Sequence, residues 1–325
     1  MNKIILFGAG ACGRFALQCG ISPLAFTDND STRWGTNFEG FPIISPEEAL
    51  RTGATFVVTI YQASARKVRE QLRSMNAPLL SLASVIPVHS DQPSGEIAAR
   101  LLEIVSEEET KAEFQNQLQF RKTWDYDTQR PPSHIRDIYF PQFIRHREDE
   151  VYFDCGAANG DTIREFIRCW PDYKMIVAFE PDAENYAAMI RLTPFRETAF
   201  ASYNCALSDS NGYIRFASFG DMSSRVDESV DTVVPSMTLD ECRHEPTYIK
   251  MDIEGAERKA LEGAHWTLQV HKPVLAIVAY HKAADLWEIP LLIHALVPSY
   301  DLRLRRYAEG ASELVWYAVP SERIR

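Results

Sequence analysis

The chain has 325 residues, 46% of them hydrophobic, which is enough for two α/β domains with packed cores. Its formal net charge of −11 argues against nucleic acid and against an anionic membrane surface as partners. No apolar run approaches the roughly 20 residues of a membrane span, and the six cysteines form no C-x-x-C pair typical of zinc sites. We therefore expect a cytoplasmic protein with reduced thiols.

Strand and helix signals alternate at the start of the chain, which predicts a parallel sheet. Ser45, directly before a proline, predicts the N-cap of a short helix. We assign residues 1–88 to a Rossmann-like N-terminal domain. Its strands are expected at residues 3–7, 24–27, 55–60 and 79–81.

A glycine-rich turn follows the first strand and defines a second nucleotide-site candidate made of Gly8, Gly10, Gly13 and Asp28. Asp28 follows Gly8 by 20 residues, which is the spacing of a dinucleotide site. A lone motif of this kind leaves three interpretations open. They are a dinucleotide or sugar-nucleotide site, a domain that presents substrate, and a structural module for oligomerisation.

Residues 89–134 change character and predict a helical connector, because apolar residues recur there at helical spacing. We expect Glu107, Glu108 and Glu109 to form a solvated charged stretch. The apolar and aromatic run at residues 138–143 fits two roles, covering the pocket of the next domain or packing a linker onto its core.

Residues 135–325 predict a second Rossmann-like domain, in which helices alternate with strands and a hairpin at 300–306 and 313–319 closes the sheet. Ile163, Phe166, Ile167 and Trp170 form one helical stripe, and Tyr186, Met189 and Ile190 another. Five parallel strands closed by an antiparallel hairpin are typical of a methyltransferase fold. The five strands end near Asp154, Glu180, Cys205, Asp252 and Tyr280.

The strand that ends at Asp154 runs into a glycine-rich turn and a helix start, a pattern that builds nucleotide pockets. Glu180 follows Asp154 by 26 residues, about one βαβ repeat, and a carboxylate there suits both hydroxyls of a ribose. The predicted cofactor-binding residues are Asp154, Cys155, Gly156, Ala157, Asn159, Gly160, Asp161, Thr162, Glu180, Pro181, Asp182, Ala206, Ser208 and Asp209.

The acids at both ends of this turn, Asp154 and Asp161, would repel a pyrophosphate but attract the sulfonium and ammonium groups of S-adenosyl-L-methionine. Ser208 or Asp209 can then reach the adenine amino group, although a loop cap explains that pair equally well.

Asp252, Glu254 and His281 are the catalytic candidates. Asp252 and Glu254 alternate at a strand end, and His281 follows the next strand, so all three can converge. A carboxylate with a histidine can deprotonate a hydroxyl, and the same set can hold a divalent metal. The alternative is a capping Glu254 and a structural His281.

The quoted motifs, with the runs at 238–240 and 249–257, resemble FkbM-type methyltransferases from about residue 135 to the C-terminus. The resemblance implies methyl transfer from S-adenosyl-L-methionine, usually to oxygen on polyketides, glycans or related acceptors. It places cofactor binding on Asp154, Gly156, Gly160 and Glu180, and Asp252 at the reaction centre. Many members end the next strand in a glutamate, where this chain has Tyr280 and His281.

We therefore predict an S-adenosylmethionine-dependent O-methyltransferase acting on a hydroxyl of a small molecule, glycan or sugar nucleotide. The N-terminal domain resembles the one that precedes sugar acyltransferases, and homo-oligomer formation stays open. Two other functions are an NAD(P)-dependent oxidoreductase that uses the first glycine turn, and a non-catalytic nucleotide-binding scaffold.

Overall fold

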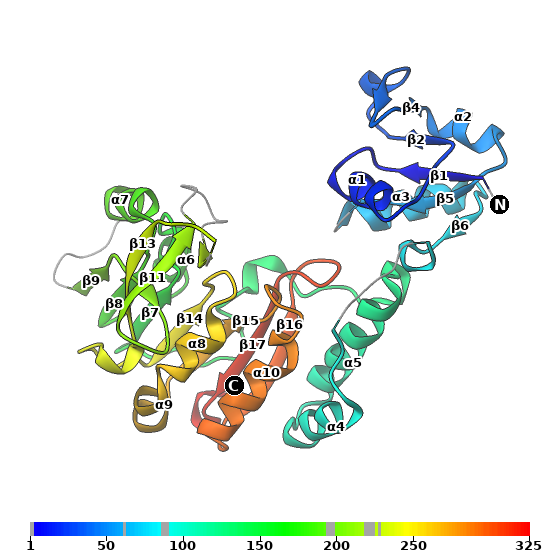
Figure 1. Cartoon of the computed structure of the whole chain (residues 1–325). Helices are drawn as coiled ribbons and strands as arrows, with labels where there is room; N and C mark the ends of the chain where they lie inside the picture. The colour runs from blue at the N-terminus through cyan, green and yellow to red at the C-terminus, as the bar shows by residue number, and fades with distance from the viewer. Residues whose placement is uncertain (1–2, 61–62, 86–90, 193–198, 218–224, 227–228) are drawn as a thin grey trace. The chain divides into compact units, whose positions relative to one another are not determined.

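The structure, a computed structural model, describes residues 3–60, 63–85, 91–192, 199–217, 225–226 and 229–325 (Figure 1). The chain divides into two compact units. Unit 1 comprises residues 1–91, 113–132 and 308–312, and unit 2 comprises the remaining residues. The boundary predicted at residue 88 lies outside the described residues.

Unit 1 contains a mostly parallel six-stranded sheet in the order β3-β4-β2-β1-β5-β6. Its centre is formed by β1 (Ile4–Phe7), whose residues are almost all buried and pair in parallel with strands on both sides. The N-cap prediction is confirmed, because the Ser45 hydroxyl accepts a hydrogen bond from the Glu48 amide. The other elements are α1 (Ala11–Gln18), β2 (Ala25–Thr27), β3 (Asn37–Phe38), β4 (Phe41–Ile44), α2 (Pro46–Arg51), β5 (Thr55–Val58), α3 (Ala63–Ser74) and β6 (Leu79–Leu80).

Two helices, α4 (Gly95–Ile104) and α5 (Glu108–Thr123), follow, as the apolar spacing predicted. The prediction of a solvated stretch at residues 107–109 is wrong for Glu107. Its carboxylate is bound by the Arg305 guanidinium at 2.8 Å. Burial raises the pKa of Glu107, but the hydrogen bonds from Arg305 and Thr110 and the Arg305 charge outweigh that effect and lower it. The charge at this position therefore pairs within unit 2.

Unit 2 is built on a seven-stranded sheet in the order β16-β17-β15-β14-β7-β8-β9. Its first five strands in sequence are parallel, and β17 pairs antiparallel with both β15 and β16. This is the predicted sheet with its closing hairpin. The strands are β7 (Val151–Cys155), β8 (Met175–Phe179), β9 (Phe200–Tyr203), β14 (Tyr248–Met251), β15 (Val274–Val278), β16 (Asp301–Arg306) and β17 (Leu314–Val319).

Helices pack on this sheet through apolar faces. Most residues of the two predicted apolar stripes are buried in these contacts. Ile163 and Phe166 of α6 (Asp161–Cys169) are fully buried. In α7 (Ala183–Leu192), Met189 is buried, but Ile190 is 41% exposed, so its assignment to the buried stripe is wrong. The remaining helices are α8 (Glu257–Glu262), α9 (His265–His271) and α10 (Asp285–Leu296).

A second, four-stranded sheet of unit 2 was not predicted from the sequence. Its strands are short, and several positions of the longest strand are exposed, so the apolar pattern is weak. The order is β10-β13-β11-β12. The strands are β10 (Ala206–Leu207), β11 (Gly212–Ala217), β12 (Arg225–Val226) and β13 (Val233–Met237).

Among the described residues, no helix combines the length and the apolar character needed to cross a membrane.

Candidate functional site

The glycine turn after β7 lies against the end of β14. Gly156 has a φ of +80°, and a Cβ atom at this position would stand 1.9 Å from the Asp252 carbonyl oxygen. Only glycine fits, because the backbone of the neighbouring strand fills the space of a side chain and the left-handed conformation disfavours one. Gly160, with the same φ, begins α6 as its N-cap.

A buried ion pair lies under this turn. Lys250 Nζ stands 3.0 Å from Asp154 Oδ1, and neither side chain is more than 2% exposed. Lys250 also donates a hydrogen bond to the Gly156 carbonyl at 2.8 Å, and Thr162 donates one to Asp154. Burial lowers the pKa of Lys250, but the Asp154 and Asp252 charges outweigh that effect and raise it. The pair holds the turn in place, and Lys250 was not among the site residues predicted from the sequence.

Glu180 follows β8 and faces the same turn. Its carboxylate accepts hydrogen bonds from the Ala158 amide at 2.8 Å and the Asp182 amide at 2.9 Å. Burial raises the pKa of Glu180 to about 7, although both hydrogen bonds oppose the rise. Glu180 is thus positioned by the backbone at the carboxyl edge of the sheet.

A cavity of about 370 Å³ opens at this edge, within unit 2 and within the size range of small-molecule sites. Its wall is largely apolar but carries six carboxylates. The acidic side chains are Asp161, Glu165, Glu180, Asp252, Glu254 and Glu313. Such a wall favours a ligand with an apolar body and positive charge.

Backbone strain concentrates around this cavity. Of the eight described residues other than glycine with positive φ, Tyr139, Ala158, Glu254 and Glu313 line it. Conformations of this kind cost roughly 1–3 kcal/mol each and persist where the surroundings enforce them, often at functional sites.

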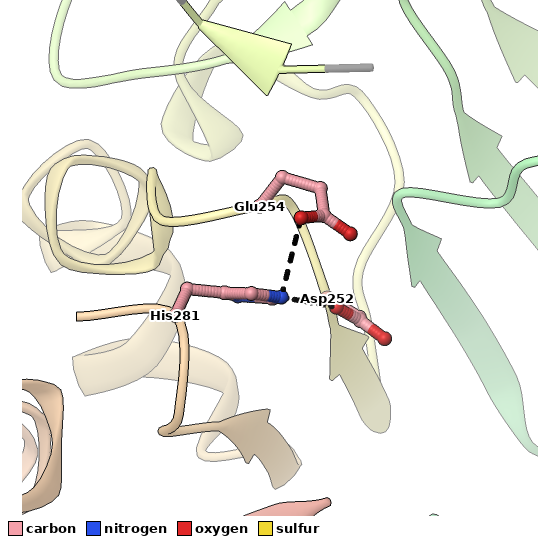
Figure 2. A group of neighbouring side chains, drawn as sticks. All are labelled: Asp252, Glu254 and His281. Carbon is pink, nitrogen blue, oxygen red and sulfur yellow. Dashed lines mark ion pairs between the residues drawn. The ribbon is translucent and has the colours of Figure 1, made fainter. Parts of the chain in front are cut away.

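Figure 2 shows that the side chains of Asp252, Glu254 and His281 point toward one another. Asp252 and Glu254 line the cavity. His281 Nε2 lies 3.6 Å from Asp252 Oδ1 and 3.5 Å from Glu254 Oε2. The positive φ values of Glu254 and Gly255, +54° and +92°, turn the chain sharply after β14. The predicted convergence of these three side chains is therefore present in the structure.

His281 is oriented by Glu257, which was not among the site residues predicted from the sequence. Its Nδ1 lies 2.9 Å from Glu257 Oε1, and Glu257 is fully buried. Burial lowers the pKa of His281, but the hydrogen bond to Glu257 and the neighbouring carboxylates outweigh that effect and raise it to about 9. At neutral pH the imidazole is therefore a cation among carboxylates.

Tyr139 connects the aromatic run to this cluster. Its hydroxyl donates a hydrogen bond to Asp252 Oδ2 at 2.8 Å, and its amide donates one to the Tyr317 hydroxyl. Its neighbour Phe140 is buried in the core of unit 2. The run therefore combines both roles considered for it, since Phe140 packs in the core and Tyr139 lines the cavity.

The remaining predicted cofactor residues divide into two groups. Gly156, Asp161, Thr162, Glu180, Pro181 and Ala206 line the cavity, as do Asp252 and Glu254. The other group lies outside its lining. Asp154, Cys155 and Ala157 are buried, and Gly160 is the N-cap of α6. Asn159 accepts a hydrogen bond from Arg164, Asp182 accepts hydrogen bonds from amides at the start of α7, and Ser208 donates one to Asp209. His281 contacts Asp252 and Glu254.

In unit 1, Gly8 and Asp28 directly follow β1 and β2, whereas Gly10 is the N-cap of α1 and Gly13 lies within that helix. Asp28 accepts hydrogen bonds from the Ala9 amide and from Arg33, whose guanidinium also donates to the Ala9 carbonyl at 2.6 Å. Arg33 therefore pairs with Asp28, the acid that would bind a ribose in a dinucleotide site.

The strand order and the cavity at the carboxyl edge define unit 2 as a methyltransferase-like α/β fold. Residues 154–307 match the family described as Methyltransferase FkbM domain.

Methyltransferase FkbM from Methylobacillus flagellatus KT is similar in structure, with a TM-score of 0.79 and 20% identity over 98% of this chain and 90% of that chain. This likeness shows a shared fold. Precorrin-6y C5,15-methyltransferase from Geobacter metallireducens GS-15 matches at a TM-score of 0.35 and 12% identity, over 58% of this chain and 94% of that chain. No curated protein matches the chain.

The additional lining residues include Tyr139, Asn185, Leu207, Phe216 and Glu313. Leu207 lies between Ala206 and Ser208 in a motif that was predicted, and Tyr139 lies in the aromatic run. The other three residues come from segments that carry no local motif.

Proposed function

We propose that this protein is an S-adenosyl-L-methionine-dependent methyltransferase that acts on a hydroxyl group. The observation that carries the proposal is the acidic cavity at the ends of β7, β8 and β14. Glu180 lies at one side of it and the cluster of Asp252 and Glu254 at another.

The residues present fit this cofactor by charge and by space. Glu180 would hold the ribose hydroxyls, and the apolar side chains of Phe179 and Leu207 would contact the adenine. The carboxylates of Asp161 and Asp252 in the wall suit a sulfonium and an ammonium group, and Gly156 lets a ligand approach the backbone. S-adenosyl-L-methionine supplies an electrophilic methyl group when bound.

The residues of this chain would then orient the acceptor and receive its proton. The acceptor oxygen would form a bond to the methyl carbon as the bond between that carbon and sulfur breaks, and Asp252 or Glu254 would take the hydroxyl proton. His281, held as a cation by Glu257, would position these carboxylates. A small-molecule, glycan or sugar-nucleotide hydroxyl is the proposed acceptor.

Calorimetric titration with S-adenosylhomocysteine tests the cofactor assignment. We expect one site per chain in the wild type and at least about tenfold weaker binding in Glu180→Gln, because the variant loses the charged acceptor of two hydroxyls. Glu165→Gln is the matched control and should stay within about threefold, since Glu165 also lines the cavity but pairs with Arg168. Binding of NADH without S-adenosylhomocysteine binding would contradict the proposal.

The raised pKa of Glu180 predicts a pH dependence of this binding. The group is ionised above a pKa of about 7 and protonated below it. If the ionised form binds, the affinity for S-adenosylhomocysteine at pH 6 should be about tenfold lower than at pH 8. Titrations at four pH values measure the effect. The Glu180→Gln variant should lose this dependence, and an equal slope in the variant would assign the effect to another group.

A further inference from the structure

We propose that Asp252, Glu254 and His281 form a binding site for one divalent cation of the Mn²⁺ type. Each residue offers one ligand atom, and the three atoms all lie within 4.8 Å of one another. Ligand atoms about 2.1 Å from a shared cation are about 3.0 Å apart at right angles and about 4.2 Å apart when opposite. The distances of 3.5 and 3.6 Å from His281 Nε2 to the two carboxylates fall in this range (Figure 2).

Asp252 presents one oxygen to this space. Its Oδ2 accepts the hydrogen bond from Tyr139, whereas its Oδ1 is buried and has no hydrogen-bond partner among the described residues. A buried carboxylate oxygen normally has such a partner. Because Oδ1 lies 3.6 Å from His281 Nε2, a cation bound between these two atoms would satisfy it.

The opposite nitrogen of His281 has the arrangement found behind metal-binding imidazoles. Nδ1 lies 2.9 Å from a carboxylate oxygen of Glu257, which also accepts hydrogen bonds from the Ile253 and Gly255 amides. Metal-bound histidines usually donate their second N–H to a carboxylate in this way. Cation binding would release the proton from Nε2. One imidazole with two carboxylates, the remaining positions being open to water or acceptor, suits Mn²⁺ and related cations.

In the proposed function, on which this role rests, the cation would bind the acceptor hydroxyl and lower its pKa. Because Asp252 and Glu254 would then be ligands of the cation, the hydroxyl proton would leave to solvent instead of to these carboxylates. The oxygen would bond to the methyl carbon as the bond from that carbon to sulfur breaks, so the charges balance. The binding site itself can be tested without any acceptor.

Electron paramagnetic resonance of Mn²⁺, added to the EDTA-treated full chain, measures binding through loss of the free-ion signal. We expect one Mn²⁺ per chain, with at least tenfold weaker binding in Asp252→Asn and in Glu254→Gln. Glu257→Gln should weaken binding about 10–100-fold through the orientation of His281. Glu313→Gln removes a carboxylate of the same cavity outside the trio and should stay within about threefold.

Absence of stoichiometric Mn²⁺ binding, or equal binding in the Asp252 and Glu254 variants, overturns the proposal. Titration of the same EDTA-treated protein with S-adenosylhomocysteine separates the two assignments. If S-adenosylhomocysteine binds and Mn²⁺ does not, the cation site alone is overturned. If Mn²⁺ binds and S-adenosylhomocysteine does not, the cofactor assignment alone is overturned.

Discussion

The substitution Lys250→Met should lower the free energy of unfolding of unit 2 by about 3–5 kcal/mol, because it leaves Asp154 buried without its counter-ion. Asp154 is fully buried, and its carboxylate lies 3.0 Å from the ammonium group that the substitution removes. Thr162 remains as a hydrogen-bond donor to Asp154, but a neutral hydroxyl does not compensate a buried charge. The Gly156 carbonyl also loses its hydrogen bond.

Hydrogen exchange of amides in β7 and β14, followed through a urea titration, measures this change within unit 2. The matched control is the double variant Asp154→Asn with Lys250→Met, which removes both charges. We expect it to recover at least about half of the loss, since neutral residues need no charge compensation. A loss below about 1 kcal/mol in Lys250→Met would show that Asp154 is not charged in the folded protein.

The substitution Gly156→Ala should reduce the affinity for S-adenosylhomocysteine at least about 100-fold and lower the midpoint of thermal unfolding. The added Cβ would stand 1.9 Å from the Asp252 carbonyl oxygen, so either the turn or the end of β14 must move. Both movements displace residues that line the cavity. The positive φ adds about 1–2 kcal/mol of strain for a residue with a side chain.

The control variant Gly53→Ala introduces the backbone strain of a positive φ without the steric collision that Gly156→Ala causes. Gly53 also has a positive φ, +67°, but an added Cβ would meet nothing within 4 Å. This control should lower stability by about 1–2 kcal/mol and leave the affinity for S-adenosylhomocysteine unchanged. Calorimetry and thermal scanning of both variants give the comparison. Equal affinity in Gly156→Ala and wild type would place the ligand away from this turn.

Much of the fold and part of the candidate site could be predicted from local patterns. Buried strands of unit 2 produce unbroken apolar runs, and Asp154, Glu180 and Asp252 stand at or next to strand ends, where parallel strands meet one edge. The hairpin that closes the sheet was predicted from the strand-like alternation of residues in its two segments. The weak, partly exposed strands β10 to β13 gave no comparable signal.

Local sequence was enough to predict the glycine turn, the acids at the strand ends and the positions of the main strands along the chain, because each depends on residues that are close together in the sequence. Tertiary structure alone decided that Lys250 pairs with Asp154 and that Tyr139 donates to Asp252. Lys250 and Asp154 are direct partners in the register of β14 and β7, 96 residues apart in sequence, so their contact depends on sheet pairing. The chemistry of the cavity follows from such long-range contacts, whose formation requires the complete sheet.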